Sequence, residues 1–360
     1  MDKNIENSFR LPAEWEQQSG IMLIMPHEDT DWEPYLKEII STYVDIIDAI
    51  TRYEDLLLIT RNIKKTKELF ATKLSERQIR RIIFFKCDNN DTWARDVAPI
   101  SLINEDGVQR MLDFCFNGWG EKFPYEKDNK INLQMAQAGI FNAEMKSHKD
   151  FILEGGSIES DGKGTLFTTT SCLLAPHRNE PFTQKEITSY LLKNIPSKRI
   201  IWLEHGSLKG DDTDGHIDTI VRCAPNDTLL YIKCEDKNDV HYSDFKKLEV
   251  QLKTLRTLND KPYRLLALPF PEAIYDNGER LPATYANFVI LNGAVLVPTY
   301  NQPKNDAKAL EIIKLAFSGY DIIGIDAQVV IRQHGSLHCL TMQLPKGIIS
   351  NNKKMNTDYE

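Results

Sequence analysis

Short apolar runs along the chain occur in pairs, separated by residues that favour turns. Residues 98–107 lead into 108–116, 156–162 into 164–174, 216–223 into 228–233, and 287–291 into 294–298. The connections contain Asp-Gly, Asn-Gly or Pro-Asn-Asp, and such residues between β-rich runs are strong signals of a tight turn. The pattern therefore predicts four β-hairpins.

After the hairpins the apolar spacing changes to that of a helix, and another apolar strand follows. Helices are expected over 242–258 and 306–317, with strands over 263–268 and 321–325. The hairpins begin near residues 96, 156, 216 and 287, a spacing of roughly 60 to 70 residues that indicates an internal repeat. Each repeat is predicted to read strand, strand, helix, strand.

The two ends of the chain together supply a fifth repeat. A strand over 21–25, a helix over 35–52 and a strand over 55–59 lack a partner strand, which residues 336–344 can provide. If the last strand pairs with the first, five α/β units close into a ring without long exposed sheet edges. We then expect one domain over residues 1–345 and a polar tail over 346–360. A doubly wound sheet with a second domain is the competing arrangement.

Composition narrows the classes of partner. The 360 residues are 41% hydrophobic and 27% charged, as in ordinary globular proteins, and the formal net charge is −8. This balance argues against binding to nucleic acid or to an anionic membrane. The sequence has no secretory signal and no apolar run long enough for a membrane helix. Its six cysteines lack CxxC spacing, which disfavours a zinc site, so a cytoplasmic protein is expected.

The stretch GDDTDGHID, residues 210–218, places four carboxylates around one histidine. A calcium loop would need ligands where Gly210 and Val221 stand, so that interpretation fails. Asp214, His216 and Asp218 alternate as on one face of a strand. Paired carboxylates suit a planar guanidinium ion better than a hard metal ion. The alternative is a solvated acidic turn.

Four more stretches carry polar residues at similar places. These are DTWARD at 91–96, FNGWG at 116–120, LEGGS at 153–157 and His338-Cys339. Each alone can be an ion-paired turn, a loop glycine or a buried cysteine. However, Asp96, Glu154, His216 and Cys339 each lie near the start of a predicted hairpin or of the closing strand. Closure of the ring would bring these residues together in one pocket.

The same stretches resemble, in order and over nearly the whole chain, the agmatine deiminase family. This family is a branch of the guanidine-modifying superfamily that includes bacterial peptidylarginine deiminases. The similar motifs are PAEWEQQSGIMLIMPH, DTWARDVAP, FCFNGWG, LEGGSIESDGKG, GDDTDGHID, LPATYANF and HGSLHCLTMQLP. The resemblance implies a fivefold pseudosymmetric α/β propeller, the pentein fold. It implies Cys339 as nucleophile, His216 as general acid and base, and Glu154 as the acid paired with His216. It also implies that Asp96 and Asp218 clamp the guanidinium, and that no metal or organic cofactor takes part.

The implied reaction is hydrolysis of agmatine to N-carbamoylputrescine and ammonia through a covalent thiouronium, a step of polyamine metabolism toward putrescine. Trp93, Trp119, Asp212 and Asp214 are candidate contacts for the ammonium end of the substrate. The Gln333-His334 pair departs from the glycine-rich run that is common in the family, which leaves the fine substrate preference open. Deimination of peptidyl-arginine or of another guanidine, a non-catalytic guanidine-binding protein and a metal-dependent hydrolase are the alternatives. A homo-oligomer is also left open.

Overall fold

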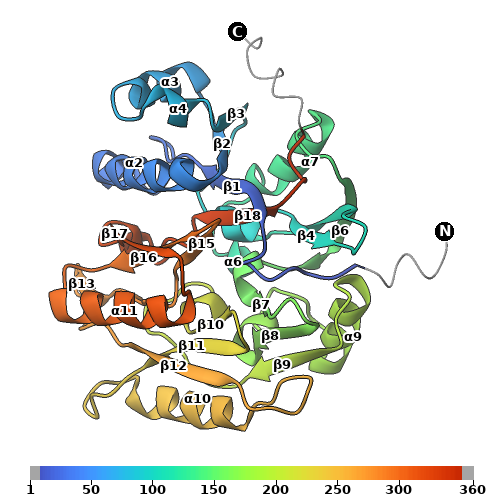
Figure 1. Cartoon of the computed structure of the whole chain (residues 1–360), viewed down its shortest axis with the longest axis vertical. Coiled ribbons are helices and arrows are strands. Elements are labelled where there is room, and N and C mark those ends of the chain that lie inside the picture. The colour runs from blue at the N-terminus through green and yellow to red at the C-terminus, as the bar shows by residue number, and fades with distance from the viewer. Residues whose placement is uncertain (1–8, 351–360) are drawn as a thin grey trace.

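The computed structural model describes residues 9–350, which form five sheets of three or four strands and one two-stranded ribbon (Figure 1). The strands are β1 Gln18–Ile24, β2 Asp55–Thr60, β3 Ile82–Lys86, β4 Ile100–Ile103, β5 Gln109–Cys115, β6 Glu144–Ile152, β7 Ile158–Ser160, β8 Thr165–Thr169, β9 Arg199–Leu203, β10 Val221–Ala224, β11 Thr228–Lys233, β12 Arg264–Pro269, β13 Tyr275–Asp276, β14 Glu279–Arg280, β15 Val289–Leu291, β16 Ala294–Thr299, β17 Asp321–Asp326 and β18 Thr341–Pro345. The α-helices are α2 Leu36–Tyr53, α3 Ile63–Ala71, α4 Glu76–Ile79, α5 Ala94–Val97, α6 Gly118–Glu121, α7 Ile131–Gln137, α8 Thr170–Leu173, α9 Gln184–Asn194, α10 Tyr242–Thr254 and α11 Pro303–Ala316. The 3-10 helices are η1 Glu33–Tyr35, η2 Asp128–Lys130, η3 Gly155–Ser157, η4 Ile217–Thr219 and η5 Val330–Gln333.

The sheets repeat one connection pattern. In four of them two strands form an antiparallel hairpin, and a third strand joins in parallel after a helical segment. The predicted hairpins β4–β5, β7–β8, β10–β11 and β15–β16 are therefore confirmed. In the remaining sheet β18 pairs antiparallel with β1, so the predicted pairing of the last strand with the first is also confirmed. The α/β class follows from this alternation of sheets and helices.

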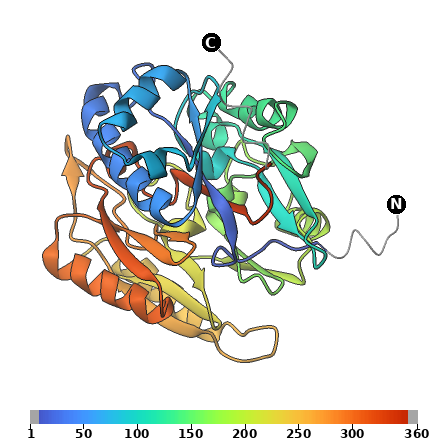
Figure 2. The same cartoon turned by 45° about the horizontal axis from the view of Figure 1, so that its top comes forward.

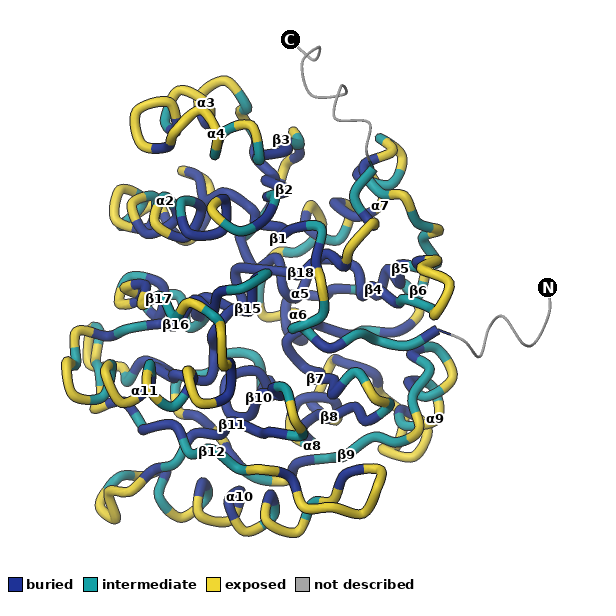
Figure 3. The backbone as a smooth tube through the Cα atoms, viewed as in Figure 1, coloured by how far each residue is buried: buried dark blue, intermediate teal, exposed yellow. Residues whose placement is uncertain are grey.

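Helices cover the outer sides of the sheets. Figures 1 and 2 show α10 and α11 along the outside of the molecule, and Figure 3 shows that the strands between them are mostly buried. Helix α2 illustrates why: Ile39, Tyr43, Ile46 and Ile50 recur at intervals of three and four residues and are fully buried. Burial of each isoleucine contributes about 1.5 to 3 kcal/mol, which fixes this helix on its sheet.

Two predicted strands begin later than the sequence pattern indicates. Residues 217–219 form η4 and residues 337–340 form turns, so the predicted strand alternation of Asp214, His216 and Asp218 is wrong. The reason is local hydrogen bonding. The Gly215 N–H donates to Asp211 Oδ2 at 2.6 Å and the His216 N–H donates to Thr213 Oγ1 at 3.0 Å, so side chains replace the ladder partners that a strand would need.

The chain continues past β18 as ordered backbone. The side chain of Ile348 is buried, and Ile349 forms a bridge with Phe141. Residues 351–360 of the predicted polar tail lie outside the described residues. Within residues 9–350, none of the helices combines the length and apolar character that crossing a bilayer requires.

A buried acid at the end of α2 gives a prediction about stability. Glu54 Oε2 accepts a hydrogen bond from Asn292 Nδ2 at 2.6 Å, and burial raises the pKa of Glu54 from 4.5 to about 8. The proton held by the folded state contributes stability that is complete below pH 4.5 and is lost as the pH rises through about 8. Glu54→Gln keeps the shape of the protonated acid. We expect it to raise the unfolding midpoint by a few degrees near pH 8 and hardly at all near pH 4.

Thermal unfolding followed by circular dichroism at the two pH values measures this difference. Glu76→Gln is the control, because its side chain is exposed on α4 and should leave the midpoint unchanged at both pH values. Equal midpoints for wild type and Glu54→Gln near pH 8 would contradict the prediction.

Candidate active site

Five polar residues lie just ahead of the first strand of five different sheets. Asp96 is in α5 before β4, Glu154 precedes η3 and β7, and Asp218 is in η4 before β10. Asn287 precedes β15, and Cys339 precedes β18. The repeats predicted equivalent placement for Asp96, Glu154, His216 and Cys339, and His216 directly precedes η4. Asn287 was not predicted as a site residue, although a predicted hairpin begins at this position.

Gly156 marks the point where three of these loops meet. A Cβ atom at this residue would lie 2.5 Å from His216 Nδ1, 3.0 Å from Asp96 Oδ1 and 3.1 Å from Asp218 Oδ2. The Gly156 N–H also donates to Asp96 Oδ1 at 2.9 Å. Glycine is required here because any side chain would separate the imidazole from the two carboxylates. The structure thus brings together His216, Asp96 and Asp218, which are up to 122 positions apart in sequence.

The Cys339 thiol is buried beside two acceptors. Its Sγ lies 3.4 Å from Asn287 Oδ1 and 3.9 Å from Asp218 Oδ2, and the Cys339 N–H donates to the same Asn287 oxygen at 3.2 Å. Burial, followed by the charges of Asp218 and Asp96, raises the pKa of the thiol well above its usual 9. Without a cation nearby, the sulfur is therefore held as a thiol.

The His216 imidazole is fully buried, and neither ring nitrogen has a hydrogen-bond partner among the described residues. Its Nδ1 lies 3.7 Å from Asp96 Oδ1. Burial alone would lower the pKa of His216, but the negative charge of Asp96 and of its other neighbours outweighs burial and raises the pKa well above 6.5. The ring is thus an imidazolium near neutral pH, with N–H groups free to donate.

Glu154 lies beside this histidine and is shared with an arginine. Arg178 Nε donates to Glu154 Oε1 at 2.7 Å, whereas Glu154 Oε2 has no partner among the described residues. A Glu154 oxygen, a His216 nitrogen and the Cys172 sulfur lie within 4.8 Å of one another. The carboxylate in ion-pair contact with His216 is therefore Asp96, with Glu154 slightly farther away. Sequence reasoning missed Arg178 and Cys172, which no motif marked.

A chain of polar contacts connects Asp218 to the N-terminal segment. His338 Nδ1 lies 2.7 Å from Asp218 Oδ2, and His338 Nε2 lies 2.8 Å from Glu14 Oε1. The hydrogen bond from His338 keeps the pKa of Asp218 below 3.8 in spite of burial, which by itself would raise it. Asp218 is therefore ionised, and its Oδ1 has no partner among the described residues. His338 fixes one carboxylate oxygen and leaves the other available.

A cavity of about 160 Å³ opens onto Cys339 and Asp96. Trp93 and Trp119 form walls: Trp93 packs on Gly335, where a Cβ would lie 2.1 Å from the indole, and Trp119 Nε1 donates to Asp96 Oδ2 at 2.9 Å. Three further carboxylates line the cavity, from Asp31, Asp91 and Asp212. Its volume is below the ~300 Å³ of pockets for drug-sized ligands, so it fits a small molecule.

The acids of this pocket were only partly anticipated. Asp212 lies in it as predicted, whereas Asp214 does not line it: the Asp214 carboxylate is 2.8 Å from Lys122 Nζ and 2.7 Å from Arg178 Nη1. Asp31 was missed, and Asp91 was noted only as part of a motif. Burial raises the pKa of Asp91 to about 6, and the nearby Asp31 adds to this. A cation bound between them would relieve that repulsion.

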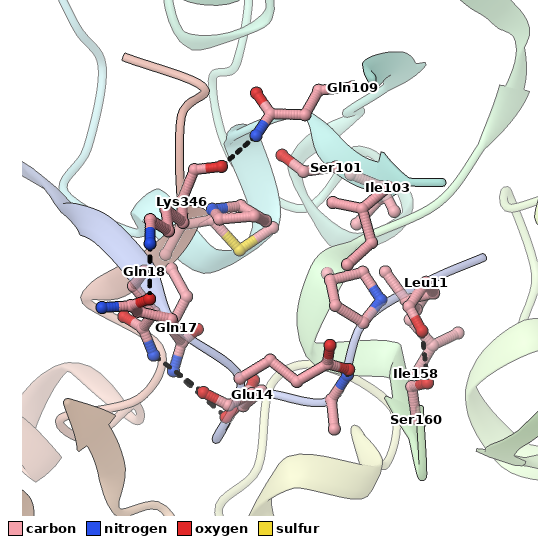
Figure 4. Close-up of a pocket in the computed structure, with 18 of the residues that line it drawn as sticks. Leu11, Glu14, Gln17, Gln18, Ser101, Ile103, Gln109, Ile158, Ser160 and Lys346 are labelled. Atoms are coloured by element: carbon pink, nitrogen blue, oxygen red, sulfur yellow. Dashed lines mark hydrogen bonds between the residues drawn. The ribbon is translucent and has the colours of Figure 1, made fainter. Parts of the chain in front are cut away.

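A second cavity, of about 280 Å³, has Arg95 among its lining residues. Figure 4 shows this larger cavity. Glu14, Gln18 and Ser101 are among its lining residues, and Cys339, His216 and Asp218 are not. Arg95 Nη1 donates to Glu14 Oε1 at 3.0 Å, so this guanidinium faces the larger cavity. The smaller cavity is the candidate active site because it contains the Cys339 thiol together with Asp96, the carboxylate that contacts the buried histidine.

Two groups of potential metal ligands occur among the described residues: Glu154, Cys172 and His216, and Glu14, Glu159 and His338. In the first group Arg178 already contacts the carboxylate. In the second group Arg222 contacts both glutamates and lies 2.9 Å from His338 Nε2. Guanidinium groups therefore already neutralise these carboxylates, which weakens their attraction for a metal ion.

Comparisons with known proteins identify the family to which the chain is similar. Residues 10–345 match the family described as Porphyromonas-type peptidyl-arginine deiminase. A protein of Marinomonas sp. (strain MWYL1), provisionally named agmatine deiminase, is 30% identical, with 94% of this chain and 95% of that protein covered.

Two solved structures extend the similarity to the fold. A provisionally named arginine deiminase from Porphyromonas gingivalis has a TM-score of 0.90 and 44% identity, over 95% of this chain and 100% of the other. A cysteine-to-serine variant of the C. jejuni agmatine deiminase with substrate bound has a TM-score of 0.87 and 39% identity, over 94% and 97% of the two chains. With a family match that spans almost every described residue, the chain belongs to the Porphyromonas-type peptidyl-arginine deiminase family.

Proposed function

We propose that this chain hydrolyses agmatine to N-carbamoylputrescine and ammonia. The observation that carries the proposal is the charge of the pocket. Asp31, Asp91, Asp96 and Asp212 line it together with Cys339, and no lysine or arginine is among its described lining residues. Agmatine carries a guanidinium at one end and an ammonium at the other, so this lining suits both ends. The α-carboxylate of free arginine would find no basic partner there.

Cys339 is assigned as the nucleophile, and Asp96 and Asp218 as the guanidinium clamp. The Asp218 carboxylate is ionised, and its Oδ1 has no partner among the described residues. Asp96 Oδ1 lies 3.7 Å from His216 Nδ1. Asn287 holds the thiol and its backbone N–H through one amide oxygen. Trp93 and Trp119 provide the walls, and Asp31, Asp91 and Asp212 receive the ammonium. Asp214 is left out because Lys122 and Arg178 occupy its carboxylate.

Substrate binding is what ionises the sulfur in this proposal. The charges of Asp218 and Asp96 raise the pKa of Cys339 in the substrate-free site, in addition to burial. A guanidinium between these carboxylates neutralises them and places a positive charge beside the sulfur, which favours the thiolate. The thiol proton passes to solvent, because His216 is already protonated, and the sulfur regains a proton from the hydroxyl of the adduct when the urea-type product leaves. The ground-state thiol then becomes a nucleophile only when the carbon it attacks is in place.

The chemistry then needs one acid and one base. The thiolate forms a bond to the guanidinium carbon, the bond from carbon to the terminal nitrogen breaks, and the His216 imidazolium donates the proton with which ammonia leaves. An S-alkylthiouronium remains on Cys339. Neutral His216 next takes a proton from water, which attacks the same carbon, and the carbon–sulfur bond breaks to release the urea-type product. Glu154 and Asp96 favour the charged ring and so its return to the acid form.

We also propose a domain arrangement, a metabolic role and a cellular location for this protein. A single domain over residues 1–345, with its five units arranged as a fivefold pseudosymmetric propeller, is supported by the repeated strand order and by the pairing of β18 with β1. The product assigns the reaction to polyamine metabolism that leads to putrescine, and a cytoplasmic location remains a prediction from the cysteine pattern.

Turnover of three substrates tests the proposal. Ammonia release is measured with agmatine, free arginine and a short arginyl peptide at equal concentration. We expect kcat/KM for agmatine to exceed that of the other two by about 10-fold or more. The pocket lining offers no lysine or arginine to the carboxylate of free arginine, and an arginine within a peptide has no ammonium to pair with the pocket acids. Equal or faster release from the peptide would favour the peptidyl-arginine alternative, and activity that chelation abolishes and metal restores would favour a metal-dependent hydrolase.

A further inference from the structure

The mouth of the acidic pocket is held by contacts between loops that are distant in sequence. Lys122 Nζ donates to the Asp212 carbonyl at 2.7 Å, which connects the loop after β5 to the loop before η4. Gln333 Nε2 donates to the Asp31 carbonyl at 2.7 Å and to Tyr35 Oη at 3.1 Å. The loops that carry the pocket acids are therefore tied to one another at the rim.

His334 provides the remaining contact across this rim. Its Nδ1 lies 2.7 Å from the Gly210 carbonyl oxygen, so Nδ1–H donates to it, and 3.7 Å from Asp212 Oδ2. His334 and Gly210 are 124 positions apart in sequence. The imidazole therefore spans from the segment before Cys339 to the acidic loop, and His334 and Asp212 both line the pocket.

The backbone of His334 adopts an uncommon conformation to reach this place. Its φ is +64°, in the left-handed region that favours glycine. Gly335 follows directly and must lack a side chain because Trp93 packs against it. A histidine in this conformation costs free energy relative to glycine, and the hydrogen bond to Gly210 offsets that cost. The imidazole is therefore held at the mouth by a backbone conformation that is unfavourable for histidine.

We propose that His334 is a specificity-determining residue that restricts the pocket to unbranched guanidino-amines and excludes peptide-bound arginine. The inference rests on the proposed function and names the substrate class of the same site. Agmatine ends in a single ammonium, which can lie among Asp31, Asp91 and Asp212. In peptidyl-arginine the equivalent carbon carries two chain branches, and both must leave through the rim. The bridge from His334 to Gly210 closes the side through which one branch would pass.

The test compares wild type with His334→Gly and His334→Asn. Glycine removes the imidazole and suits the positive φ, and asparagine tolerates this φ but is too short to bridge to Gly210. We measure kcat/KM for agmatine and for N-acetyl-arginine methylamide, a minimal arginyl peptide. Both variants should raise kcat/KM for the peptide about 10-fold or more. They should change kcat/KM for agmatine by less than about fivefold, because the lost contact is partly exposed.

His177→Gly is the matched control. His177 also has a positive φ, of 60°, and its Nδ1 lies 3.7 Å from Glu121 Oε2, but it does not line the pocket. This variant should leave kcat/KM unchanged for both agmatine and the peptide. Thermal unfolding midpoints of all variants show whether a loss of activity reflects unfolding.

The inference is overturned if kcat/KM of the wild type for the peptide equals its kcat/KM for agmatine. It is also overturned if both His334 variants fold normally and neither gains activity on the peptide. Should wild type release no ammonia from agmatine, the proposed function fails by itself. The inference is then decided by calorimetric binding in Cys339→Ala. In the Cys339→Ala background, His334→Gly must tighten binding of the peptide about 10-fold or more relative to binding of agmatine. Unchanged binding of the peptide rejects the inference.

Discussion

Replacing Cys339 by alanine is expected to lower kcat for agmatine by about 10⁴-fold or more while substrate still binds. The sulfur forms the bond to the guanidinium carbon in the proposed reaction, and alanine offers no substitute. Binding should persist because it depends on Asp96, Asp218 and the acids of the pocket, which lie on other loops. Ammonia release measures the loss of turnover, and calorimetry with agmatine measures binding.

A second cysteine provides the control for this experiment. Cys172 is fully buried within 4.8 Å of His216 and Glu154, and burial raises the pKa of its thiol above 9. Cys172→Ala should leave most of the turnover, since Cys172 is not among the residues that line the pocket. If Cys339→Ala keeps turnover and Cys172→Ala loses it, the assignment of Cys339 as the nucleophile is wrong and Cys172 takes that role.

Asp218→Asn is expected to lower kcat/KM for agmatine by about 10³-fold. The substitution removes one of the two charges that hold the guanidinium, and truncating one partner of a buried charge pair costs about 2 to 5 kcal/mol. It also removes the acceptor charge for His338 at 2.7 Å, so the carboxamide can turn its NH₂ group toward the substrate. Steady-state kinetics with agmatine, over concentrations well above and below KM, separates the effects on kcat and KM.

Asp113→Asn is the matched control because it also alters a buried aspartate. Asp113 pairs with Lys149 at 2.7 Å and accepts from Asn132 Nδ2 at 2.8 Å, in β5 outside the pocket. This variant should lower the unfolding midpoint and leave kcat/KM for agmatine unchanged. A similar kinetic defect in both variants would mean that Asp218 acts through stability and not through the substrate.

The hairpins were predictable because turn chemistry is local. Asn292-Gly293 occupies the turn between β15 and β16, and Asp106-Gly107 lies in the turn between β4 and β5, as the sequence indicates. Strand β18 was predicted to begin too early, and so was β10, which follows η4. There Asp211 and Thr213 satisfy backbone N–H groups with their side chains, and apolar spacing carries no information about such bonds.

The candidate site was predictable to the extent that it follows the repeat. Asp96, Glu154, His216 and Cys339 were marked because each precedes a strand that begins a unit, and resemblance to a known family added Asp218. Asp31 and Arg178 belong to no repeat position and to no charge pattern that distinguishes them from surface residues. Their place in the pocket and beside Glu154 depends on how loops from different units pack.

The sequence by itself therefore determined only part of what the four acids around His216 do. Local features of each segment, its apolar periodicity and its turn residues, determine the order of the strands and the repeat. They also determine which loops carry the reactive side chains. Which carboxylate holds which cation is decided by distances between segments that are far apart in sequence, such as the 92 positions between Lys122 and Asp214. Asp214 pairs with Lys122 and Arg178, and Asp218 remains available to a substrate, because electrostatic interaction depends on separation and burial in the folded chain.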